Sequence, residues 1–100
     1  MLVEFVVPNK TVKLGRVIDE CVKRIVGRWG GCTVTYCQTG YWRNPKTGVT
    51  EVEPVCTLSV SVDQDIASWF DELAQYVCEH GDQDTVYYRT VPSGHRFVCV

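Results

Sequence analysis

The sequence lacks several features that would assign it directly to a class of protein. It has no apolar run near the ~20 residues of a membrane span, so we expect no membrane association. Ten Lys and Arg against twelve Asp and Glu give a formal net charge of −2. Domains that bind nucleic acid usually carry a basic patch, so we expect no nucleic-acid partner. The first residues show no basic segment of a secretory signal, which predicts a cytoplasmic protein.

Signatures of metal sites and disulfide frameworks are also missing. The six cysteines include no C-x-x-C pair, and there are only two histidines. Cys32 and Cys37 would point to opposite faces of one strand, whereas structural zinc sites use tight paired spacings. We therefore expect no metal, no cofactor and reduced cysteines that pack as small apolar side chains. No G-x-S-x-G, Walker loop or G-x-G-x-x-G occurs either.

What the sequence has is a globular composition and a regular alternation of patterns. One hundred residues, 45% hydrophobic and 22% charged, predict a single domain over 1–100. Period-2 and period-3.6 segments follow one another along the chain. The strands are expected at 2–7, 32–37, 51–62 and 85–91, with a short one at 95–100.

Two amphipathic helices separate these strands. The first has apolar residues from Leu14 to Trp29, including Ile18 and Val26, with Thr11 as N-cap and Gly30-Gly31 as its end. The second follows Asp63, its expected N-cap, and stops at Gly81. Its apolar stripe is Ile66, Trp69, Phe70, Leu73, Ala74 and Val77.

The order β-α-β-β-α-β, with an extra C-terminal strand, predicts an α+β ferredoxin-like fold. Both helices should cover one face of an antiparallel sheet. Cys56, Leu58, Val60 and Val62 belong to the covered face, and Val55 and Thr57 to the open one. A bare face and an apolar C-terminal strand predict an oligomer.

The candidate site is the stretch from Gly40 to Glu53, with Gln38 to Gly48 expected as a loop. Tyr41, Trp42 and Arg43 place two aromatic rings and a guanidinium close to two carboxylates. Loops with such contents on a rigid scaffold often bind ligands. An ordinary hairpin turn that Trp42 holds in place is the alternative.

The two carboxylates of this stretch, Glu51 and Glu53, share one strand face about 6.6 Å apart. Such a pair could perform acid–base chemistry if burial separated the two pKa values. The commoner alternative is a solvated strand end, paired with Arg43 or Arg89.

The run Gly40-Tyr41-Trp42-Arg43, then Glu53 and the strand to Val62, resembles the phage S-adenosylmethionine lyases. The segments 82–88 and 92–95 are similar to that family as well. Part of the same stretch is also similar to a small bacterial domain family of unknown function, and the topology resembles the trimeric PII-type signalling proteins. These resemblances imply a homotrimer with ligand clefts between subunits.

The resemblance to the lyases implies cleavage of S-adenosylmethionine to methylthioadenosine and homoserine lactone, in the host cytoplasm if the chain is phage-encoded. Glu53 would be the catalytic residue and would hold the substrate ammonium. Tyr41, Trp42, Arg43 and Glu51 would bind the substrate. Trp42 stands where the family has a tyrosine, and an indole attracts a sulfonium but has no hydroxyl to offer.

Two further functions remain open at this point. One is a non-catalytic trimer that binds or sequesters an adenine-containing small molecule. The presence of Trp42 where the lyases have a tyrosine favours it. The other is a protein-interaction module that uses the open sheet face.

Overall fold

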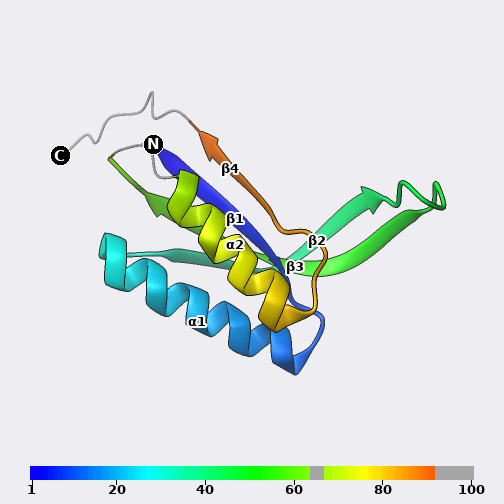
Figure 1. Ribbon diagram of the computed structural model, residues 1–100, viewed down its shortest axis with the longest axis horizontal. Helices are drawn as coiled ribbons and strands as arrows, with labels where there is room; N and C mark the ends of the chain where they lie inside the picture. Colours follow the sequence, from blue (N-terminus) through cyan, green and yellow to red (C-terminus); the bar gives the residue numbers. More distant parts are fainter. Residues whose placement is uncertain (64–66, 92–100) are drawn as a thin grey trace.

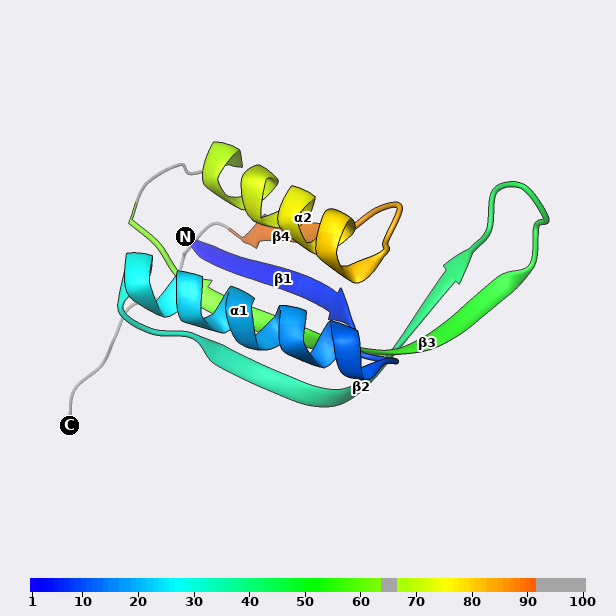
Figure 2. The ribbon, with the colours of Figure 1, turned by 60° about the horizontal axis from the view of Figure 1, so that its bottom comes forward.

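A computed structural model describes residues 1–63 and 67–91 of the chain. The elements are β1 (Leu2–Pro8), α1 (Val12–Trp29), β2 (Thr33–Arg43), β3 (Thr50–Ser61), α2 (Ala67–Gly81) and β4 (Tyr87–Val91). The strands form one antiparallel sheet in the order β2-β3-β1-β4. Both helices lie on the same face of this sheet (Figures 1 and 2). The predicted α+β ferredoxin-like fold is confirmed, while the expected strand at 95–100 lies outside the described residues.

Helix α1 begins and ends where its caps predict. The hydroxyl of Thr11 accepts a hydrogen bond from the Leu14 N–H at 3.1 Å. At the other end Gly30 has a φ of 86°, and its N–H donates to the carbonyl oxygen of Val26. The helix buries the predicted stripe at Leu14, Val17, Ile18, Cys21 and Ile25. Val26 departs from the prediction and is exposed, although Ile25 before it is buried and Trp29 after it packs against the core.

Helix α2 differs from the prediction at its C-terminal end. The structure describes it from Ala67 to Gly81, and residues 64–66, between this start and the expected cap Asp63, lie outside the described residues together with the predicted apolar residue Ile66. The helix includes Gly81, and the left-handed residue that ends it is Asp82, with a φ of 54°. Gly81 has another role, since a Cβ there would lie 2.8 Å from Cδ2 of the buried Leu14. The glycine therefore allows the two helices to approach each other closely.

The hydrophobic core fills the space between the helices and the sheet. The covered face presents alternate residues of β1 and β3, and α2 adds Phe70, Leu73 and Val77. The Phe70 ring lies 4.9 Å from that of Trp69 and 6.2 Å from that of Phe5, measured between centroids. Cys56, Leu58, Val60 and Val62 are buried as predicted. The faces that the sequence predicts to be buried are therefore largely the ones that the structure buries.

Beyond the helices, β2 and β3 continue as a two-stranded arm (Figures 1 and 2). It makes the molecule 49 Å long and only 25 Å wide. On β3, the residues from Cys56 to Val60 alternate between buried and half-buried, and Val55 before them is buried as well. From Thr50 to Pro54 all but one are exposed on either face, because no helix lies above them.

Candidate ligand-binding groove

Most of the segment that the sequence predicts as a loop is strand. β2 runs without a break through Gly40 to Arg43, which pairs with Thr50. Glycine and proline in the segment 38–48 favour a loop prediction. In the structure, however, Gly40 is a member of the ladder. The candidate residues therefore lie on a two-stranded arm (Gln38–Arg43 with Thr50–Val55).

Only the tip of the arm is a turn. The Gly48 N–H donates to the carbonyl oxygen of Asn44 at 2.8 Å, and the Asn44 N–H donates to that of Val49 at 2.9 Å. Gly48 has a φ of 71°, which glycine adopts without strain. The side-chain oxygen of Asn44 also accepts from the Lys46 N–H. This part of the predicted loop is confirmed as an ordinary hairpin turn.

A β-bulge in β2 decides which side chains the arm presents to each face. The pairing with β3 shifts by one residue between Thr35 and Gln38, and Cys37 inside the bulge has a φ of 60°. Because side chains alternate along a strand, one extra residue exchanges the two faces beyond it. Trp42 therefore shares a face with Glu53, and Tyr41 lies on the other. No residue type in the sequence signals this bulge.

The Trp42 ring lies across the backbone of Gly40. A Cβ at Gly40 would meet Cζ3 of the indole at 2.8 Å and Cγ1 of Val55 at 3.2 Å. Val55 belongs to the open sheet face, as predicted, yet it is only 5% exposed. Pro8, its register partner on β1, is buried as well. A small apolar cluster thus forms on the open face at the base of the arm.

Glu53 is paired with a lysine that is distant in sequence. Lys10, in the connection between β1 and α1, donates from Nζ to Oε2 of Glu53 at 2.7 Å. The Glu53 side chain is 13% exposed and that of Lys10 is 46% exposed. The carboxylate is therefore enclosed, whereas the lysine approaches it from the solvent side.

Arg43 and Arg89, the expected partners of Glu51 and Glu53, bind other groups. Arg89 pairs with Glu4, and Arg43 donates from Nε to the carbonyl oxygen of Gly48. Glu51 accepts from the side-chain amide of Asn44 at 3.0 Å. Each arginine binds its near neighbour across the ladder or the turn, and a pattern of single residues does not reveal such pairing.

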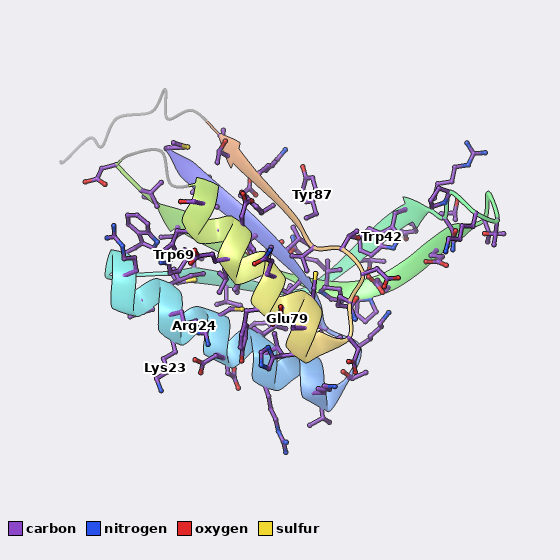
Figure 3. The ribbon with its side chains drawn as sticks, viewed as in Figure 1. Lys23, Arg24, Trp42, Trp69, Glu79 and Tyr87 are labelled. Atoms are coloured by element: carbon purple, nitrogen blue, oxygen red, sulfur yellow. The ribbon has the colours of Figure 1, made fainter. Side chains whose placement is uncertain are left out.

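All five predicted site residues line one groove of about 910 Å³. Tyr41, Trp42, Arg43, Glu51 and Glu53 come from the arm, and Lys10 stands beside them. The opposite wall is the connection between α2 and β4, residues 82–86, with Tyr87 at the start of β4. Figure 3 shows Trp42 and Tyr87 on these two different elements.

The groove offers aromatic surface and charge. Trp42 is 39% exposed and Tyr87 is 61% exposed. Among the described residues that line the groove, none is His, Cys or Ser. The wall at 82–87 is missing from the predicted site residues. The similarity of 82–88 to the lyases was the one sequence signal for it.

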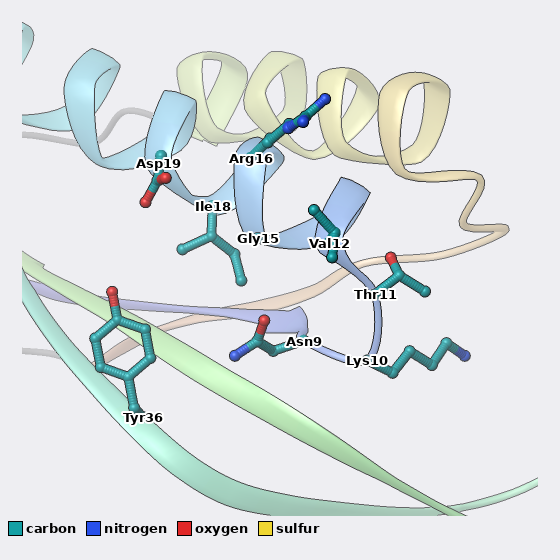
Figure 4. A pocket seen from close by; sticks show the side chains of 9 residues that line it. All are labelled: Asn9, Lys10, Thr11, Val12, Gly15, Arg16, Ile18, Asp19 and Tyr36. Carbon is teal, nitrogen blue, oxygen red and sulfur yellow. The ribbon is translucent and has the colours of Figure 1, made fainter.

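A second hollow lies between the start of α1 and β2 (Figure 4). It has a volume of about 560 Å³, and Ile18, Asn9 and Tyr36 are among its lining residues. Thr11 at its rim already caps α1. Within the two described ranges no buried polar side chain without a partner points into this hollow, so we assign no ligand to it.

The cysteines behave as predicted where they are buried. Burial raises the pKa of Cys21 to about 12 and that of Cys56 to about 11. Cys37 differs, since it is exposed at the bulge. In the part of the chain that the structure describes, no three His, Cys, Asp or Glu side chains gather closely enough to hold a metal ion. No helix of that part is long and apolar enough to span a membrane.

Comparisons with known proteins support the fold. No family model matches the chain, and no curated protein matches it. Among solved structures, CutA1 from Oryza sativa is 14% identical, with 96% of this chain and 81% of that one covered at a TM-score of 0.67. The divalent cation tolerance protein (Cut A1) from Thermus thermophilus is 16% identical, with 94% and 85% covered and a TM-score of 0.60.

At these identities the likeness establishes the ferredoxin-like fold and carries no activity with it. It gives no support to the resemblance to the phage lyases. The function therefore has to be argued from the groove itself.

Proposed function

We propose that this protein binds an adenine-containing small molecule in the groove between the arm and the α2–β4 connection, and that it does so without catalysis. The observation that carries the proposal is the convergence of five residues from the arm with Tyr87 and Lys10 on one groove. Small-molecule sites are commonly concave, partly aromatic and equipped with a few convergent polar groups. The groove has each of these properties.

The aromatic residues favour a flat ring system. Trp42 lies across Gly40 and is 39% exposed, so part of its ring is covered and part is open to the groove. Stacking of a base on an aromatic side chain contributes about 1–3 kcal/mol. Tyr87, on the opposite wall, offers a second ring. An adenine base fits this chemistry.

The charges favour binding over catalysis. Glu53, the expected catalytic residue, is enclosed and already neutralised by Lys10 at 2.7 Å. A cationic group of a ligand would have to displace Lys10, which can leave because it reaches in from solvent. Glu53 is therefore an exchangeable counter-ion and lacks the free carboxylate that a general base needs.

The similar structure named as a divalent cation tolerance protein suggests metal binding as a competing function. Nothing in residues 1–63 and 67–91 provides a preformed cluster of three metal-binding side chains. We therefore place the organic ligand first and include divalent cations in the test.

We also propose that the protein is a homotrimer. The support is the open sheet face together with the PII-like topology of the chain. Light scattering should report a mass of about three chains.

The experiment is calorimetric titration of the protein with adenosine, ATP and S-adenosylmethionine, and separately with Cu²⁺ and Zn²⁺. We expect binding of at least one adenine compound, with the affinity reduced about tenfold or more in Trp42→Ala and in Tyr87→Ser. Tyr36→Ser is the matched control, because Tyr36 is 55% exposed, close to the 61% of Tyr87, but lies outside the groove. Its affinity should be unchanged.

Three results would contradict the proposal. If the protein bound divalent cations and none of the adenine compounds, its ligand would be a metal ion and the proposed ligand class would be wrong. Equal losses in Tyr87→Ser and Tyr36→Ser would place the site elsewhere. Release of methylthioadenosine from S-adenosylmethionine, lost in Glu53→Gln, would restore the lyase function.

A further inference from the structure

The first residues of β2, Thr33 to Tyr36, form an edge of the sheet to which only β3 is paired within the described chain. Alternate N–H and C=O groups of an edge strand point away from the sheet. Natural edge strands usually carry a charged residue or a proline, which prevents pairing with a further strand. The segment 33–36 has neither, and its Thr, Val and Tyr residues favour strands. This edge is therefore suited to accept another strand.

Helix α1 supplies an apolar wall beside this edge. The hollow at the start of the helix is lined by Val12 and by Tyr36 of β2. Val12, Asp19 and Val26 follow one another at intervals of about two helical turns, so they share one side of α1. Val34 pairs with the buried Leu58 and therefore faces the helix side of the sheet. The hollow is thus one end of a longer groove between α1 and the edge of β2, which we call the edge groove.

One carboxylate faces the edge groove. Asp19 lines the hollow, is exposed and forms no ion pair with another described residue. Figure 4 shows Asp19 and the Tyr36 ring directed into the same space, while Arg16 points away from it. Lys10, the other cation of the hollow, is paired with Glu53. A carboxylate and an exposed aromatic ring both attract a guanidinium or ammonium group, so the charge here favours a basic side chain.

We propose that the edge groove binds an extended segment of a partner protein. The segment adds a strand to β2, its apolar side chains contact Val26 and Val34, and a basic side chain binds Asp19 beside the Tyr36 ring. In recognition by strand addition, main-chain hydrogen bonds give affinity and pockets for alternate side chains give specificity. The hollow offers no buried polar group to a small molecule, whereas an added strand binds through the backbone.

This surface is separate from the two that the proposed function uses. The groove beside the arm and the hollow have only Lys10 in common among their lining residues. The proposed trimer rests on the open face of the sheet, and the edge groove lies on the face that carries the helices. Peptide binding is therefore independent of the adenine ligand and is compatible with the trimer.

The groove also specifies the order of residues in the partner segment. Side chains alternate along a strand, so every second residue of the added strand lies on the helix side. Antiparallel pairing is the more stable kind. In that direction the basic residue comes first, opposite Tyr36, and apolar residues follow two and four positions later. The segment that fits has a basic residue followed by alternating polar and apolar residues.

The test uses the fluorescein-labelled peptide Ser-Arg-Thr-Val-Thr-Val-Ser with an amidated end, and fluorescence anisotropy measures its binding to the native protein. We expect saturable binding, and about tenfold weaker binding when glutamate replaces the arginine. Two further peptides carry N-methyl groups either on the arginine and both valines or on both threonines. One of them should lose binding and the other keep it, because only alternate N–H groups face β2.

Variants of the protein locate the site. Asp19→Lys should weaken binding of the arginine peptide by about tenfold or more and should improve binding of the glutamate peptide. Glu72→Lys makes the same charge change at an exposed position of α2 away from the groove, and it should leave both affinities unchanged. Tyr36→Ser should weaken peptide binding and spare adenine binding, whereas Tyr87→Ser should do the opposite.

Each contrary result overturns a defined statement. If the native protein does not bind the arginine peptide at about 1 mM, or if Asp19→Lys and Glu72→Lys cause equal losses, the edge groove is not the site. If both N-methylated peptides bind, or neither does, strand addition is wrong. Slow hydrogen exchange of all the amides of 33–36 without peptide would mean that a second copy covers this edge, which also overturns the proposal. Peptide binding without adenine binding would contradict the proposed function alone.

Discussion

The body of the molecule and its arm share the strands β2 and β3, yet the side chains of these strands are buried in one region and exposed in the other. Where the helices cover the sheet, β3 hides Leu58 and Val60 on one face. Past the helices the same strand leaves Val52 57% exposed. The sequence keeps apolar and aromatic residues on the arm even though a single subunit does not bury them. Core residues serve stability, and such arm residues serve contact with a ligand or another chain.

The largest expected effect is a loss of unfolding free energy from a substitution in the core of the body, compared with a substitution on the arm. Phe70→Ala removes a fully buried ring that packs between Phe5, Trp69 and Tyr88. Truncation of a buried phenylalanine costs about 3–5 kcal/mol of unfolding free energy. Denaturant unfolding should show this loss. Tyr41→Ala, measured at a concentration where the protein is monomeric, should change the free energy by less than about 0.5 kcal/mol.

The buried thiols of the body give the next effect. Burial raises the pKa of Cys21 to about 12 and that of Cys56 to about 11, from an ordinary value of 9.0. Above pH 9 the unfolded chain loses these protons and the folded chain keeps them. Stability is thus fully present below pH 9 and falls through the window up to pH 11–12.

The expected loss is about 1 kcal/mol for each thiol per pH unit within that window. Thermal unfolding from pH 8 to pH 10.5 measures it. The variant Cys56→Ala should have a shallower dependence than the native protein. An equally steep dependence would show that other groups cause the loss.

Two glycines with the same close approach sharpen the comparison. A Cβ at Gly81 would press on the buried Leu14, and one at Gly40 would press on the Trp42 ring, each at 2.8 Å. Leu14 is enclosed and cannot move away, so Gly81→Ala should lose about 1 kcal/mol after its gain in helix propensity. Trp42 can swing outward, so Gly40→Ala should keep its stability and lose affinity for the adenine ligand. Denaturant unfolding and calorimetric titration of both variants measure the two effects.

The smallest effect concerns the bulge that separates the two regions. Cys37 has a left-handed φ of 60°, which costs a residue with a side chain roughly 1 kcal/mol and glycine almost nothing. Cys37→Gly should therefore raise the unfolding free energy, measured in denaturant, by about 0.5 kcal/mol. A loss of stability in Cys37→Gly would contradict this. It would mean that the thiol makes a stabilising contact worth more than the backbone strain that the substitution removes.

Helix α1 was predictable because its signals are local. Thr11, the apolar spacing and Gly30 each act within one or two turns, and the structure confirms all three. The arm was not predictable as a strand. Gly40 in its ladder carries the ordinary signal of a loop, and only the pairing with Glu53 of β3 makes it a strand residue.

The candidate residues were identified from composition, while their arrangement came from contacts across the chain. Tyr41, Trp42, Arg43, Glu51 and Glu53 do line one groove. Lys10, the partner of Glu53, stands 43 positions away and shows no pattern that would link the two. Tyr87 was expected as part of a strand and of the segment similar to the lyases, and it was not among the predicted site residues.

The sequence by itself determined which segments are helix or strand over most of the described chain and which of their faces are apolar, because periodicity and capping act over a few residues. The tertiary structure alone decided how far the helices cover the sheet, where the bulge exchanges the faces of β2, and that Lys10 meets Glu53. These depend on register and on the meeting of distant segments, and a single residue in the bulge is enough to turn Trp42 toward the groove.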